Sequence, residues 1–100
     1  MIIYNVTVKV DLDIHEEWVE WMKNDHIPDV MATSMFEGYR MAHVLLQDES
    51  EGITYSIQYD CKDMATLQKY TAQFAPALQK DVKTRYPDKF VAFRTLLEVI

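Results

Sequence analysis

Two tryptophans and a histidine lie close together on one predicted helix, and their side chains could form a ligand site. Trp18 and Trp21 are three residues apart, so both project from the same helical face. His26 follows them, and Pro28 interrupts the helix two residues later. A broad aromatic surface that ends beside a titratable imidazole is typical of the wall and rim of a pocket. The spacing therefore predicts that the segment from Trp21 to Pro28 borders the main cavity.

His26 has two interpretations. Imidazole titrates near neutral pH, so a histidine at a pocket rim could act as a general base. Alternatively, the ring caps the carbonyl groups at the end of the helix and packs against Met22, one turn earlier. We favour capping, and we retain His26 as the candidate catalytic residue because His15 and His43 occupy less suitable positions, in a helix's first turn and on a strand.

Metal and cysteine chemistry are not predicted. The histidines are scattered and have no carboxylate at a regular ligand spacing, so we expect no metal site. Cys61 is the single cysteine, which excludes an internal disulfide and a cysteine cluster and suits a reducing cytoplasm. The chain has no glycine-rich phosphate loop, and we expect no cofactor.

Composition restricts the class of partner. Sixteen Asp and Glu residues against ten Lys and Arg residues give a net charge of -6, which disfavours nucleic acid and anionic membrane surfaces. No apolar run approaches the length needed to cross a membrane, and the first residues alternate like a strand rather than a signal peptide. We expect one cytoplasmic domain over residues 1–100, with 49% apolar residues supplying an ordinary core.

Apolar periodicity predicts six elements in the order βαββαβ. Asp13 and Asp63 precede the two helical patterns as candidate N-caps, and Pro28 and Pro76 should end or kink those helices. Right-handed crossovers then place both helices on one side of the sheet. This arrangement is a ferredoxin-like α+β sandwich with a four-stranded antiparallel sheet. The predicted strands span residues 2–10, 35–46, 53–61 and 89–99, and the predicted helices span 14–27 and 63–86, with one further helical turn considered over 29–33.

The sheet face away from the helices is predicted to be polar, because the apolar set of each strand should face the helices. For the last strand, the predicted helix-facing set is Val91, Phe93, Leu97 and Val99. The open face is either simply solvated or a polar cleft that fixes an oxygen-rich ligand. Arg94, opposite Asn5 or Thr7, is the best anion-binding candidate because guanidinium binds carboxylates with a forked geometry. The candidate binding residues are Trp21, Asn5, Thr7, Ser56, Gln58 and Arg94.

The element order, the length and the long first helix resemble the dimeric α/β-barrel superfamily. It includes antibiotic-biosynthesis monooxygenases, muconolactone isomerases and the ethyl tert-butyl ether degradation family, in which two sheets meet face to face. More narrowly, Trp21-Met22, His26 to Met31 and Phe36 resemble a family of short bacterial proteins of unknown function, common in Bacteroidetes. His26 and Pro28 also resemble the histidine-x-proline pair near the end of the first helix in the ether-degradation group.

The resemblance implies a homodimer that pairs through the open face, where Ala92, Leu96 and Ile100 are expected beside the polar set. Our leading hypothesis is a small-molecule binding or accessory protein, with a small hydrophobic or oxygen-rich ligand. One alternative is a cofactor-free monooxygenase or isomerase that acts on a hydrophobic cyclic substrate. Another is a structural dimer that modifies a partner protein.

Overall fold

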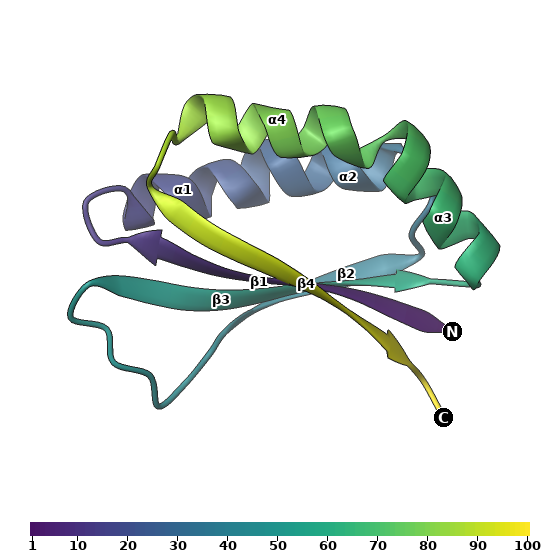
Figure 1. The fold of residues 1–100 in the computed structure, drawn as a ribbon, viewed down its shortest axis with the longest axis horizontal. Helices are drawn as coiled ribbons and strands as arrows, with labels where there is room; N and C mark the ends of the chain where they lie inside the picture. Colours follow the sequence, from purple (N-terminus) through teal and green to yellow (C-terminus); the bar gives the residue numbers. More distant parts are fainter.

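The computed structural model describes all residues, 1–100, as a sheet covered on one face by helices (Figure 1). The sheet order is β2-β3-β1-β4, and every neighbouring pair of strands is antiparallel. This arrangement confirms the predicted ferredoxin-like α+β sandwich. The elements are β1 (Ile2–Asp11), α1 (His15–Trp21), the π-helix η1 (Met22–His26), α2 (Ile27–Ala32), β2 (Gly38–His43), β3 (Gly52–Cys61), α3 (Met64–Gln73), α4 (Ala75–Arg85) and β4 (Phe90–Glu98).

The core lies between the sheet and the helices. Alternate residues of β1 and β3 are buried against the helix layer, as the alternation in these two strands predicts. The helices supply the facing side chains, of which Trp18 and Leu67 are each only 1% exposed. The buried hydrophobic residues of the two strands are Ile2, Tyr4, Val8, Val10, Ile57, Tyr59 and Cys61.

The first helical region differs from its prediction at Pro28, although the further turn considered over 29–33 is present as part of α2. Instead of ending near Pro28, it continues through a π-helical turn, in which the Ile27 amide donates to the carbonyl of Met22, into α2. Pro28 lies in the first turn of α2, where its missing N–H leaves no α-helical bond unmade. The predicted Asp13 cap is wrong: Ile14 is the N-cap residue, and Asp13 accepts a hydrogen bond from Lys89 at 2.7 Å.

The second helical region follows its prediction. Asp63 caps α3 by accepting a hydrogen bond from the Thr66 amide at 2.8 Å. The helix breaks at Phe74, and Pro76 lies in the first turn of α4. The second predicted strand is shorter than expected, because β2 covers only six of the residues between 35 and 46.

The prediction for the faces of β4 is wrong. Residues directly opposite one another in neighbouring strands share a face, and Arg94 lies opposite Val6 whereas Phe93 lies opposite Thr7. Arg94 and Ala92 therefore face the helices, and Val91 and Phe93 lie on the open face. Side chains of a strand alternate between the two faces of the sheet, so an error in the face of one residue is an error in the face of every residue of that strand. Both residue sets of β4 contain apolar side chains, and the more apolar set is the open one.

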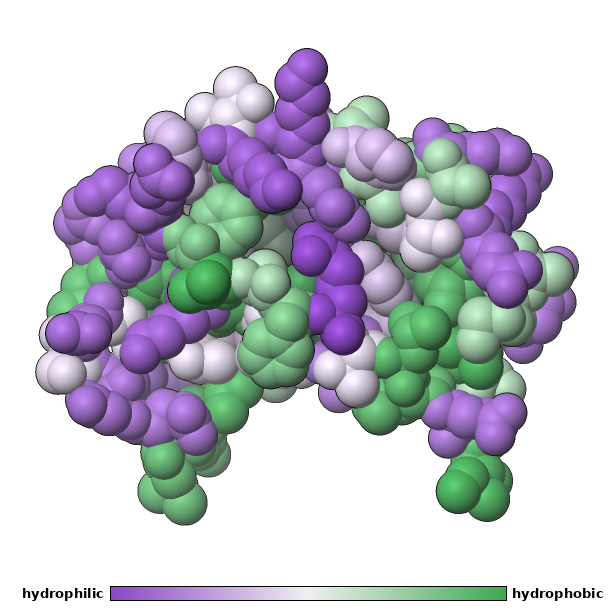
Figure 2. Space-filling model, viewed as in Figure 1, coloured by the Kyte–Doolittle hydropathy of each residue, from purple (hydrophilic) through white to green (hydrophobic).

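Two apolar projections extend from the molecule on the side away from the helices. They are the β2–β3 loop and the C-terminal end, and both carry hydrophobic side chains (Figures 1 and 2). Leu45 and Leu46 in the loop are 71% and 102% exposed, and Ile100 is 117% exposed. None of the helices is long and apolar enough to cross a membrane.

Candidate functional site

A cavity of about 430 Å³ lies between the helix layer and the β1–β4 side of the sheet. Its walls come from β1, β3 and β4 on one side and from α1, η1, α2, α3 and α4 on the other, and most of the lining side chains are hydrophobic. Ligand pockets in proteins commonly have volumes of about 300–1,000 Å³, with a few polar groups among apolar ones. The cavity is therefore large enough for a ring-sized molecule.

The π-helical turn shapes the helical wall of this cavity. Trp18, Met22, His26 and Val30 all line it at a spacing of four residues. In a regular α-helix, residues four apart drift by about 40° around the axis, so three such steps would turn the last residue about 120° away. A π-turn advances less per residue and cancels part of this drift. The wide turn therefore keeps His26 and Val30 on the cavity side.

His26 lines the cavity and is half-buried. Its ring stacks on Trp21 with the ring centres 5.2 Å apart, and its side chain makes no hydrogen bond. Because the helix continues past His26, the capping interpretation is wrong. Burial lowers the pKa of His26, against the opposing charges of Asp29 and Asp81, while Arg94 lowers it further. The neutral imidazole, the form that can accept a proton, is therefore favoured.

The indole that lines the cavity is Trp18 rather than Trp21. Trp21 is half-buried behind His26, contacts Tyr86 edge-on at 5.6 Å and carries the Arg85 guanidinium 5.3 Å above its ring. It borders a separate, shallow depression between α2 and α4. The segment from Trp21 to Pro28 thus borders the main cavity through Met22 and His26. The binding role predicted for Trp21 stays a prediction.

Arg94 lies in the cavity wall with His26, not on the open face with Asn5 and Thr7. Its Nε donates a hydrogen bond to the Tyr4 hydroxyl at 3.0 Å. The predicted position of Arg94 is wrong because Arg94 pairs with Val6, which faces the helices, rather than with a residue of the open face. The structure therefore places two candidate residues, His26 and Arg94, in the wall of one cavity, and separates them from the four candidates on the open face.

Sequence reasoning missed a group of tyrosines at this end of the cavity. Tyr4, Tyr59 and Tyr70 line it, and their rings pack around Phe36 with centres 4.7–6.0 Å from its ring. Burial raises the pKa of Tyr59 and of Tyr70, so both hydroxyls stay protonated. The available signal was the helix-facing position of Tyr4 and Tyr59 in alternating strands, which predicts that their rings lie in the core.

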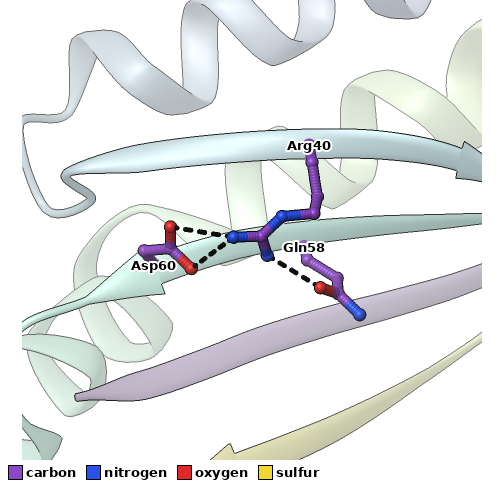
Figure 3. A network of polar contacts seen from close by, with 3 residues as sticks. All are labelled: Arg40, Gln58 and Asp60. Atoms are coloured by element: carbon purple, nitrogen blue, oxygen red, sulfur yellow. Dashed lines mark hydrogen bonds and ion pairs between the residues drawn. The ribbon is translucent and has the colours of Figure 1, made fainter. Parts of the chain in front are cut away.

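The four open-face candidates belong to a polar surface whose members bond to one another. The Ser56 hydroxyl donates to Asn5 Oδ1 at 2.6 Å, and Asn5 Nδ2 donates to Thr7 Oγ1 at 3.0 Å. Gln58 Oε1 accepts from Arg40 Nη1 at 2.8 Å, and Arg40 also pairs with Asp60 at 3.3 Å (Figure 3). Arg40 was not among the predicted residues. The binding roles of Asn5, Thr7, Ser56 and Gln58 stay predictions.

The other two histidines lie on either side of Tyr55, at the β2 edge of the sheet. His15 hydrogen-bonds the Tyr55 hydroxyl, and the His43 ring lies 5.6 Å from the Tyr55 ring. His43 Nε2 also pairs with Glu49 at 2.6 Å, which ties the β2–β3 loop to β2. No three His, Cys, Asp or Glu side chains come together in a way that could hold a metal ion.

Comparisons with known proteins agree with the fold. The sequence profile of a family described as a domain of unknown function, DUF4286, matches residues 1–100. A protein of the EthD family from Bacillus halodurans superposes with a TM-score of 0.70 at 14% identity, covering 100% of both chains. SnoaB from Streptomyces nogalater, described as a cofactor-independent oxygenase, gives 0.67 at 9% identity, covering 98% of this chain and 92% of that one.

A protein from an uncultured marine organism, described as a dimeric ferredoxin-like protein, gives a TM-score of 0.54 at 16% identity and covers 99% of this chain and 96% of its own. No curated protein matches the sequence. Identities this low establish a shared fold and carry no information about a reaction.

Proposed function

The chain belongs to DUF4286, a domain family of unknown function, and from this premise we propose that it binds a small, mostly apolar molecule in the cavity between helices and sheet. The observation that carries the proposal is the cavity itself, about 430 Å³ with mostly hydrophobic walls and a few polar groups. Trp18, Met22 and Val82 would contact the apolar part of the ligand. The protein would then act as a binding or accessory protein of the dimeric α/β-barrel type.

The test is binding of a neutral hydrophobic fluorophore, N-phenyl-1-naphthylamine, to the purified protein. Ala92 lines the cavity, so Ala92→Leu should fill part of it and weaken binding about tenfold or more. Ala42→Leu is the matched control, because Ala42 is exposed on the open face. Equal binding to both variants, with circular dichroism showing that both are folded, would contradict the proposal.

A cofactor-free oxygenase or isomerase that acts on a hydrophobic cyclic substrate is the second candidate. Its support is the position of His26, a half-buried and unbonded imidazole in the cavity wall whose pKa is lowered by burial. Such a base could remove a proton from an acidic carbon of the bound ring. Once a substrate is known, His26→Gln should lower turnover about 10²- to 10⁴-fold with little change in fold. Unchanged turnover in this variant would remove His26 from the catalytic role.

The remaining features of the proposal concern the cellular form of the protein. We infer a single-domain homodimer of bacterial origin that works in the cytoplasm. The fold is shared with a protein described as dimeric, and the open face of β4 is apolar enough to need a cover. The free thiol of Cys61 is buried and unpaired, which suits a reducing compartment.

A further inference from the structure

The part of the cavity wall formed by Arg94 and the tyrosines carries hydrogen-bond donors. Arg40 and Arg85 each pair with a carboxylate, at 3.3 Å and 3.6 Å, but Arg94 has no ion-pair partner. Its one side-chain bond runs through Nε to the Tyr4 hydroxyl, which leaves both terminal nitrogens without a protein partner. In a chain with a net charge of -6, an arginine at a cavity without a carboxylate partner is a specific anion-binding candidate.

Two tyrosine hydroxyls without a protein partner also line the cavity. Tyr59 and Tyr70 are each only 3% exposed and line the cavity, and neither hydroxyl makes a hydrogen bond within the protein. The hydroxyl oxygens are not among the buried atoms that lack a partner, so they are reached from the cavity and are free to donate to an acceptor supplied by a ligand. Arg94 bonds the Tyr4 hydroxyl, and the Tyr4 ring centre lies 6.2 Å from that of Tyr59 and 5.7 Å from that of Tyr70, so Arg94 and the tyrosines line the same part of the cavity.

We propose that the ligand is a ring carboxylate, whose carboxylate group is held by Arg94 and the hydroxyls of Tyr59 and Tyr70 while its ring occupies the apolar part of the cavity. The proposal rests on the function proposed above and names the class of ligand. A guanidinium binds a carboxylate through two parallel N–H bonds, and both terminal nitrogens of Arg94 are free to do so. Burial keeps the pKa of Tyr59 and of Tyr70 raised, so both remain donors at neutral pH.

The other charged groups of the lining do not oppose this assignment. Lys83, on α4, is a second cation at the cavity wall. Asp88 is the only carboxylate in the lining, and it lies in the turn between α4 and β4. His26 contributes no positive charge while its imidazole is neutral. The cavity therefore favours an anion at the tyrosine end.

The experiment compares 1-naphthoate with its neutral analogue 1-naphthamide by calorimetry at neutral pH. The two probes have the same ring and differ mainly in the charge of the polar group. We expect naphthoate to bind about ten- to a hundredfold more tightly, since hydrogen bonds to a charged group are stronger than neutral ones.

Three variants localise the effect. Arg94→Gln, Tyr59→Phe and Tyr70→Phe should each lower naphthoate affinity about tenfold or more, and naphthamide affinity much less. Arg40→Gln is the matched control for charge, because Arg40 lies on the opposite face of the sheet. Tyr39→Phe is the matched control for a hydroxyl, because Tyr39 pairs with Tyr59 but does not line the cavity. Both controls should bind naphthoate like the wild type.

The two tyrosine variants should fold at least as stably as the wild type, because each removes a hydroxyl that has no partner in the protein. A clear loss of stability would mean that the hydroxyls serve the fold, and would overturn their assignment. Equal affinity for the two probes, or naphthoate affinity unchanged in all three variants, would overturn the ligand class. If N-phenyl-1-naphthylamine still binds in those cases, only the assignment of the ligand class is contradicted. If it does not bind, the proposed binding function of the cavity is itself contradicted.

Discussion

At the scale of single residues, His26 and Arg94 are the pair that the fold creates. They are 68 positions apart in the chain, and both line one cavity because the π-turn directs the first and the register of β4 directs the second. Neither cause can be read from the local sequence. The sequence indicated that each side chain could take part in binding or catalysis, but it did not predict that both would line the same cavity.

The lowered pKa of His26 gives a pH prediction. The unfolded chain binds a proton at this histidine with a pKa near 6.5, and the folded protein binds it less readily. The contribution of His26 to the free energy of unfolding is therefore fully present above pH 6.5, and it is lost as the pH falls from 6.5 towards the pKa of His26 in the folded protein. Urea unfolding at pH 7.5 and pH 5.5 should show a larger loss for the wild type than for His26→Gln. His15 and His43 are present in both proteins, so an equal loss would contradict the assignment.

The two tryptophans should differ in their contributions to stability. Trp18 is 1% exposed, so Trp18→Ala should lower the free energy of unfolding by about 3–5 kcal/mol. Trp21 is half-buried against His26 and Tyr86, and Trp21→Ala should cost about half as much, since less apolar area is lost. Chemical denaturation of both variants measures the difference. A larger loss for Trp21→Ala would contradict the placement of the two indoles.

At the scale of elements, the strength of the sequence pattern decided what could be predicted. β1 and β3 alternate clearly between apolar and polar residues, and both their bounds and their faces were predictable. β4 is apolar on both faces, because one set lines the cavity and core while Val91, Phe93 and Leu97 lie on the open face. Binary patterning assumes one buried face, so it selected the wrong one. The predicted position of Arg94 in the candidate site was wrong for the same reason, because Arg94 belongs to this strand.

The π-helical turn explains how Pro28 fits inside a continuous helical region. Deleting Asn24, an exposed residue of η1, would change the cavity-lining spacing to i, i+4, i+7 and i+11, which is the regular α-helical pattern. The four lining residues would still project from one face of the helix. Pro28, however, would then lie within a regular α-helix, and its ring would clash with the carbonyl four residues earlier.

We therefore expect deletion of Asn24 to cost about 3 kcal/mol or more in the free energy of unfolding. Combining it with Pro28→Ala should restore most of that loss, and Pro28→Ala alone serves as the control. Thermal and urea unfolding of the three proteins provide the measurement. A deletion variant as stable as the wild type would show that Pro28 is not the reason for the wide turn.

At the scale of the whole molecule, the open face requires an explanation that the isolated chain does not provide. Val91 and Phe93 are 71% and 63% exposed, and Leu97 and Val99 are 41% and 46% exposed, all along one edge of the sheet. Proteins rarely expose a contiguous apolar patch unless it binds something. Our prediction placed Ala92 and Leu96 on this face, but both face the helix side, so the open face is more apolar than expected.

A second copy of the chain is the occupant that we predict for this face. Polar groups at its centre, including Asn5 and Ser56, already bond to each other and could remain hydrated within an interface. The β2–β3 loop and the C-terminal end project on this side with apolar side chains, and would extend the contact beyond the sheet (Figure 1). One protein that shares the fold is described as dimeric.

Light scattering at micromolar concentration should therefore give about twice the monomer mass of 11.8 kDa. Phe93→Asp places a charge in the centre of the apolar strip, and it should yield a folded monomer because a buried unpaired carboxylate would oppose association. Met64→Asp is the matched control: Met64 is 42% exposed, but it lies at the start of α3, away from the open face. A monomeric wild type, or a Phe93→Asp variant that stays dimeric, would contradict pairing through this face.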